Sequence, residues 1–144
     1  TILIDQANNP KQNLEGVTTG THSLTHTSSN PEKRAELKRV EEAQFRELAV
    51  LLKAMKETGE PGSTLLDRTM VLYGSNFGDA NQHTCFNQPI LFAGGGFKHG
   101  QHLAFNESNP VPLCNLYVSA LQRLGLDVAK FGSSTATVPG LEMA

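Results

Sequence analysis

The segment Thr69-Met70-Val71-Leu72-Tyr73 is a continuous apolar run that predicts a buried β-strand. A second run of this kind follows at Pro89-Ile90-Leu91-Phe92-Ala93. Uninterrupted apolar runs of this length are typical of strands that are covered on both faces. A polar or glycine-rich stretch follows each run, and ligands of open α/β sheets bind beyond the carboxyl ends of the strands. The sequence therefore predicts a site at the loops 74–79 and 94–96.

A long amphipathic helix is predicted over residues 31–56. Ser29 or Asn30 is its expected N-cap, Pro31 suits the first turn, and Gly59 and Pro61 end the helix. One set of positions recurs at three- and four-residue steps and is expected to face inward: Leu37, Val40, Gln44, Leu48, Leu51, Leu52 and Met55. The charged positions between them are interpreted as a solvated face: Lys33, Arg34, Glu36, Lys38, Arg39, Glu41, Glu42, Arg46 and Glu47.

The rest of the chain completes an α/β pattern. A last helix is expected over residues 113–124, and residues 5–29 show no period, which predicts a long loop. Residues 1–5 have the composition of a strand interior, and no signal peptide is recognised there. The order of elements predicts an α/β fold over residues 1–144. The strand-like opening at residues 1–5 leaves two expectations, a single domain or a carboxyl-terminal fragment of a larger domain with part of the site upstream.

Composition argues against several classes of protein. Among 144 residues, 38% are hydrophobic and 18% charged, which is typical of a folded globular domain. A net charge of −2 gives no basic surface for nucleic acid. The apolar runs are far shorter than the ~20 residues of a transmembrane helix. Cys85 and Cys114 fit no metal motif, and a disulfide between them is left open.

Three histidines have the chemistry of a metal site. His22 and His26 lie four residues apart in a segment rich in hydroxyl side chains, and His83 follows the first predicted strand. Three neutral imidazoles would leave a fourth position of a zinc ion for water, which could then attack a phosphate or sulfate ester. Asp79 would orient an imidazole or add an oxygen ligand. The alternative is that these histidines only bond to loop backbone.

The loops after the two predicted strands offer a weaker signal for anion binding. Backbone N–H groups at Gly95 and Gly96, together with Ser75 and Asn76, could hold an anion. A tight turn that needs positive φ angles is the alternative for the glycines. Ser75 and Ser23 are conceivable nucleophiles, but neither lies in a Gly-x-Ser-x-Gly motif.

The histidine segment carries a family resemblance. His22-Ser23-Leu24-Thr25-His26-Thr27 resembles the HxxSHH signature of a family of secreted bacterial proteins of unknown function, found in planctomycetes and related lineages. Matching segments follow at residues 65–75, 81–83, 89–96 and 131–132. That family is similar to the alkaline phosphatase and sulfatase superfamily. The resemblance implies the carboxyl-terminal portion of a sulfatase-like sheet with flanking helices, a divalent metal such as zinc or calcium, and a secreted or periplasmic location.

Two departures from the family pattern leave three hypotheses open. Thr25 and Thr27 replace a signature serine and histidine, and Ser75-Asn76-Phe77-Gly78 stands where the superfamily commonly has Asp-His-Gly. The first hypothesis is a metal-dependent hydrolase of phosphate or sulfate esters, with polysaccharide esters among its substrates. The second is a non-catalytic module that binds a polymer or a cell-surface partner. The third is a structural subunit that docks a partner chain, or the missing amino-terminal part, through the helix 31–56.

Overall fold

The computed structural model describes residues 10–27 and 29–144. The chain has a mixed α/β architecture and divides into two compact units. Unit 1 contains residues 1–54 and 75–88, and unit 2 contains residues 55–74 and 89–144. The strand predicted at residues 1–5 lies outside the described residues.

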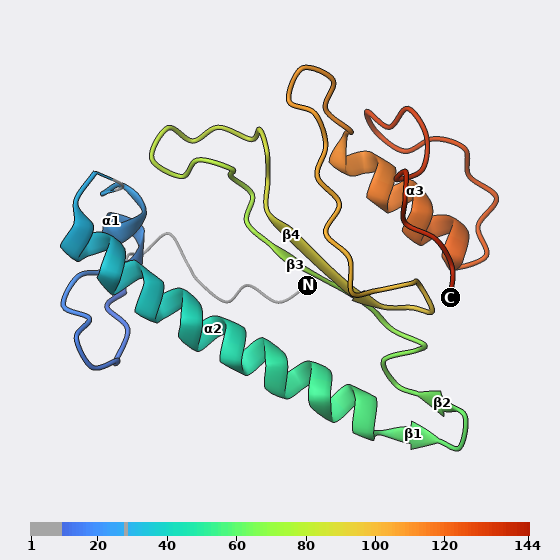
Figure 1. Cartoon of the computed structure of the whole chain (residues 1–144), viewed down its shortest axis with the longest axis horizontal. Helices are drawn as coiled ribbons and strands as arrows, with labels where there is room; N and C mark the ends of the chain where they lie inside the picture. Colours follow the sequence, from blue (N-terminus) through green and yellow to red (C-terminus); the bar gives the residue numbers. More distant parts are fainter. Residues whose placement is uncertain (1–9, 28) are drawn as a thin grey trace. The chain divides into compact units, whose positions relative to one another are not determined.

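The long helix α2 spans Pro31–Glu57, as the sequence predicts (Figure 1). Asn30 is the N-cap residue, because its side-chain oxygen accepts hydrogen bonds from the amides of Glu32 and Lys33 at 3.0 and 3.1 Å. Three of the predicted inward positions are buried: Val40, Leu48 and Met55. The prediction of a wholly solvated charged face is wrong at one position, since Glu36 is only 8% exposed.

The loop predicted over residues 5–29 contains a short helix, α1 (Thr21–Thr25). Leu24 of α1 is 1% exposed and forms the core of unit 1 with Val17 and Val40. Figure 1 shows α1 beside the amino-terminal part of α2. A five-residue helix is too short to give a periodic apolar pattern, and it depends on this packing for its stability.

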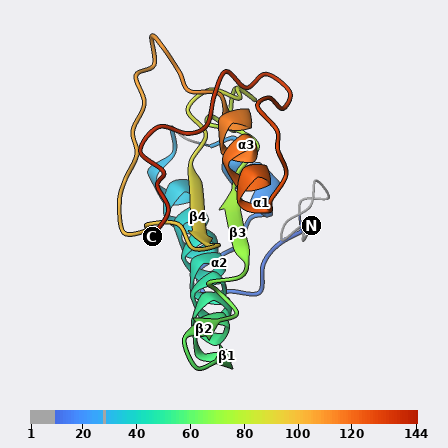
Figure 2. The same ribbon diagram turned by 90° about the vertical axis from the view of Figure 1, so that its right-hand side faces the viewer.

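The two predicted strands are β3 (Met70–Gly74) and β4 (Ile90–Gly94), each displaced by one residue from its expected range. They form an antiparallel pair in unit 2, with Gly74 opposite Ile90 (Figure 2). In an antiparallel pair the carboxyl end of one strand lies beside the amino end of the other. The loops that follow β3 and β4 therefore leave the pair at opposite ends, which corrects the prediction of one common site.

The expected burial of both faces of the strands is also wrong. Leu72 and Leu91 are 41% and 36% exposed, respectively. A continuous apolar run predicts a strand, but it does not show whether other parts of the fold cover the two faces of that strand.

Unit 2 also contains a tight hairpin and a helix. Strands β1 (Gly59–Glu60) and β2 (Ser63–Thr64) pair directly after α2, around the residues Gly59 and Pro61 that are predicted to end the helix. Helix α3 spans Leu113–Arg123, close to the predicted range. Both cysteines of the chain are free thiols. In the part of the chain that the structure describes, no helix has the length and apolar character needed to cross a membrane.

Candidate metal site

Helix α1 presents two histidines on the side opposite its buried leucine. Residues of an α-helix are separated by about 100°, so His22 and His26 share one face and Leu24 lies on the other. Leu24 is buried against Val17 and Val40, whereas His22 is exposed and His26 is half-buried. His26 is the C-cap residue of α1. The burial of Leu24 therefore turns both imidazoles toward the surface of unit 1.

The third histidine lies on an ordered hairpin over residues 75–88. The amide of Gly78 donates to the carbonyl of Thr84 at 2.9 Å, and the amide of Thr84 donates to the carbonyl of Asp79 at 3.1 Å. The Asp79 carboxylate accepts the amides of Asn81 and Gln82 at 2.8 and 3.1 Å. Asp79 thus shapes the turn that precedes His83 through both its carboxylate and its backbone carbonyl, which accept backbone amides of the hairpin.

His26 and His83 face each other with their ring nitrogens. Their Nε2 atoms are 3.3 Å apart, and the ring centroids are 4.9 Å apart at an interplanar angle of 77°. Zn–N bonds of 2.0–2.1 Å in a tetrahedral arrangement place two ligand nitrogens about 3.3 Å apart. The separation of these two nitrogens equals that of two ligands on a tetrahedral zinc ion, and it also lies within the distance of a hydrogen bond between the two imidazoles.

His22 extends the cluster on the other side of His26. The ring centroids of His22 and His26 are 4.9 Å apart at an interplanar angle of 67°. Among residues 10–27 and 29–144, no three His, Cys, Asp or Glu side chains converge on a single metal position as they stand. The structure brings the three predicted histidines together, with the His26 ring between those of His22 and His83.

Phe77 is a feature of the site that the sequence did not reveal. Its ring stacks on His83 with centroids 5.2 Å apart and an interplanar angle of 25°. His83 itself has a φ angle of +54°, and Asn87 of the same hairpin has +53°. Positive φ angles are costly for residues with a side chain and often occur at functional sites. A phenylalanine six residues before a histidine matches no sequence motif. The contact between Phe77 and His83 could therefore be found only from the fold of the hairpin.

Some polar groups of the four predicted anion-binding residues form hydrogen bonds within the protein. In unit 1, the Ser75 hydroxyl accepts the Phe77 amide at 3.1 Å, and the Asn76 carbonyl accepts the Gln88 side chain at 2.8 Å. In unit 2, the Gly95 amide donates to the Leu66 carbonyl at 3.0 Å, and the Gly96 carbonyl accepts the Ala144 amide at 2.9 Å.

The three successive glycines that begin at the last residue of β4 fit the turn alternative. Gly94, Gly95 and Gly96 have φ angles of +77°, +68° and +77°, respectively. A tight left-handed turn explains why three glycines stand in succession.

No known protein family, curated protein or solved structure matches this chain. The resemblance of residues 22–27 to the HxxSHH signature therefore stays a prediction. The geometry of unit 1 is the main support for any function of this chain.

Gly78→Ala is expected to disrupt the hairpin that carries His83. A Cβ atom at Gly78 would lie 1.7 Å from the carbonyl oxygen of Phe86, so the two sides of the hairpin must separate. We expect a loss of about 1–3 kcal/mol in the free energy of unfolding, measured by urea denaturation. Gln82→Ala is the control, because Gln82 is an exposed residue of the same hairpin, where truncation of the side chain should change the free energy of unfolding by about 0.5 kcal/mol or less. Equal losses in both variants would contradict the prediction.

Proposed function

We propose that this chain carries a zinc site formed by His26, His83 and His22, and that it hydrolyses phosphate or sulfate esters. The observation that supports the site best is the 3.3 Å separation of the Nε2 atoms of His26 and His83. His22 would reach the ion by rotation of its side chain, a motion that is fast for an exposed residue. With three imidazole ligands, the fourth position is left for water or substrate.

Zinc is the better candidate of the two metals that the resemblance implies. Imidazole nitrogens suit zinc and other late transition metals, whereas calcium takes six to eight oxygen ligands. The one carboxylate of the hairpin, Asp79, already accepts two backbone amides through one oxygen. A nitrogen-rich set of this kind supports zinc.

The residues around the proposed site would have distinct tasks. A bound zinc ion would supply Lewis acidity and an activated water near neutral pH. Phe77 fixes the ring plane of His83 by stacking, and Leu24 fixes the direction of α1 and hence of His26. Restricting ligands in this way lowers the entropy cost of binding an ion.

Two parts of the proposal rest on the resemblance of residues 22–27 to the HxxSHH signature. They are the sulfatase-like fold and the choice of phosphate or sulfate esters as substrates. On this basis we assign the chain to the carboxyl-terminal portion of a sulfatase-like α/β domain of an exported bacterial protein. An upstream segment of the same protein, or a partner chain, would supply the remaining catalytic groups. A polysaccharide that carries sulfate or phosphate esters is one substrate that fits this assignment.

The proposed function is tested by metal content and ester hydrolysis together. Protein purified without an affinity tag is analysed by elemental mass spectrometry and assayed on aryl phosphates and aryl sulfates. We expect about one equivalent of zinc per chain, as three imidazole ligands imply, and hydrolysis that a chelator stops. Zinc without hydrolysis would instead favour the non-catalytic binding module. Absence of zinc would overturn the proposal.

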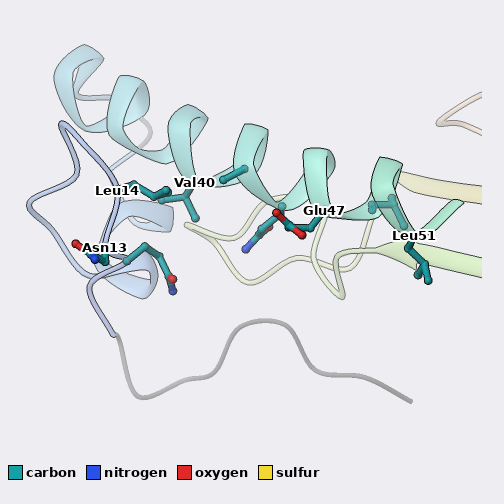
Figure 3. Close-up of a pocket in the computed structure, with 9 residues that line it drawn as sticks. Asn13, Leu14, Val40, Glu47 and Leu51 are labelled. Carbon is teal, nitrogen blue, oxygen red and sulfur yellow. The ribbon is translucent and has the colours of Figure 1, made fainter. Parts of the chain in front are cut away.

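A second candidate function is supported by the exposed apolar residues of α2. Phe45, Val50 and Leu51 are 49%, 63% and 46% exposed, respectively. A groove of about 480 Å³ lies along the same helix in unit 1, and its lining includes Leu14, Val40 and Leu51 (Figure 3). Exposed apolar surface of this kind is typical of protein contacts.

This second candidate is a structural subunit that docks a second copy of the chain through α2. Sedimentation of the wild type over a range of concentrations is compared with the variant Leu51→Glu, which changes an exposed residue that lines the groove. A dimer that the variant loses supports docking. A monomer at every concentration of wild type argues against it.

A further inference from the structure

The geometry points to Glu36 as a positioning residue of the histidine site: together with Lys33 it holds α1 in the orientation that presents His22 and His26. This inference rests on the proposed zinc site and adds a residue that the sequence pattern assigned to solvent. Glu36 lies on the second turn of α2, away from the histidines in sequence. Its effect on the site is therefore exerted through the segment that leads into α1.

The Glu36 carboxylate is fully engaged with that segment. Its Oε2 atom accepts the amides of Thr18 and Thr19 at 2.8 and 3.0 Å. Its Oε1 atom accepts the Thr18 hydroxyl at 3.2 Å and the Lys33 ammonium at 2.7 Å. The same ammonium donates to the Thr19 hydroxyl at 2.6 Å. We call these four residues the Glu36 clasp.

The clasp supplies an anchor that α1 lacks by itself. The N-cap residue of α1 is Gly20, which gives no side-chain hydrogen bond to the helix. A helix of five residues has no independent stability. Leu24 packs α1 against the core, and buried Thr21 bonds the first residue of α1 to the Pro10 carbonyl. The clasp adds a third anchor directly before Gly20, on the side of α2, and so helps to determine where His22 and His26 point.

The hydrogen bonds that the Glu36 carboxylate accepts in the clasp are assisted by its negative charge. Lys33 is the cation that contacts the carboxylate, and Arg39 binds the nearby Gly16 carbonyl at 3.2 Å. Hydrogen bonds to an ionised carboxylate are roughly twice as strong as neutral ones. Replacing Glu36 by glutamine removes this charge with little change in shape, and it leaves the histidines themselves intact.

The clasp predicts a pH dependence of stability. The Lys33 ammonium and the amides of Thr18 and Thr19 lower the pKa of Glu36 from 4.5 to about 2. Because the pKa is lower in the folded state, this contribution is complete above pH 4.5 and is lost as the pH falls from 4.5 toward 2. The melting temperatures of wild type and Glu36→Gln should therefore converge over this range. Circular dichroism measures them, and a constant difference would contradict the prediction.

The inference itself is tested by zinc affinity, measured by competition with a chromogenic chelator. We expect Glu36→Gln to weaken zinc binding by about 10–100-fold, the usual effect of losing a residue that orients a ligand. Glu42→Gln is the charge control, because Glu42 pairs with exposed side chains of α2, Lys38 and Arg46. Leu48→Ala is the stability control, since it removes a buried side chain of α2 away from the clasp.

A spectroscopic measurement separates positioning from general destabilisation. The visible absorption of cobalt(II) bound in place of zinc reports ligand geometry. It should change in Glu36→Gln and stay the same in Glu42→Gln and Leu48→Ala. Zinc affinity and a cobalt spectrum identical to those of the wild type in Glu36→Gln would overturn the inference.

A readout without metal keeps this test distinct from the test of the zinc site. Hydrogen exchange of metal-free protein should be faster in Glu36→Gln at the amides of Thr18, Thr19 and α1. If the wild type binds no zinc, the proposed function fails. Faster exchange would then still support the role of Glu36 in holding α1, whereas unchanged exchange would refute it.

Discussion

His26→Ala is expected to lower the zinc affinity of the chain by more than about 100-fold. Loss of a residue that only orients a ligand costs about 10–100-fold, so loss of a central ligand should cost more. His26 is central because its ring contacts His22 on one side and His83 on the other. Without the His26 ring, only the imidazoles of His22 and His83 remain, and they no longer have a ring between them. Chelator competition and elemental analysis both measure the effect.

His102→Ala is the matched control for this experiment. His102 is an exposed histidine of unit 2, and the proposed site does not include it. The control should retain the zinc affinity of the wild type. If both variants bind zinc as the wild type does, His26 is no ligand, and the proposed site is wrong.

Leu24→Ala is expected to reduce the free energy of unfolding by about 2–5 kcal/mol. Leu24 is 1% exposed and packs with Val17 and Val40 in the core of unit 1. Its truncation leaves a cavity and removes the apolar anchor of α1. We therefore expect a larger loss of stability than Gly78→Ala or Glu36→Gln causes. Urea denaturation followed by circular dichroism measures it.

Leu126→Ala tests whether the effect depends on burial. Leu126 is 51% exposed, so its truncation should change the free energy of unfolding by about 0.5 kcal/mol or less. Similar losses in the two variants would show that Leu24 does not anchor a packed core.

The sequence predicts α2 and α3 well because their signals are local. A cap, a long apolar period and terminal glycines or prolines determine where such helices begin and end. The positions of β3 and β4 are also predicted to within one residue. Their antiparallel pairing is a contact between segments that lie apart in the chain, and an apolar run carries no information on direction.

The histidine site is predictable in part. The spacing of His22 and His26 places them on one helical face, but their approach to His83 depends on the fold of the hairpin 75–88. Glu36 fits a solvated helical face by its position, and only the Thr18 and Thr19 amides explain its burial. Polar contacts between loops and helices have no periodic signature, so they are absent from a pattern of apolar and polar residues.

The register of β3 and β4 has a consequence for how this chain can vary. Gly74 and Ile90 pair at the end of the ladder, so the chain returns to the sheet beside the point where it left. Loops whose ends lie close together tolerate insertions and deletions at a small entropic cost. The hairpin that carries His83 can therefore change in length between related proteins while the strands keep their pairing. Such variation would alter the position of His83 without rebuilding the sheet.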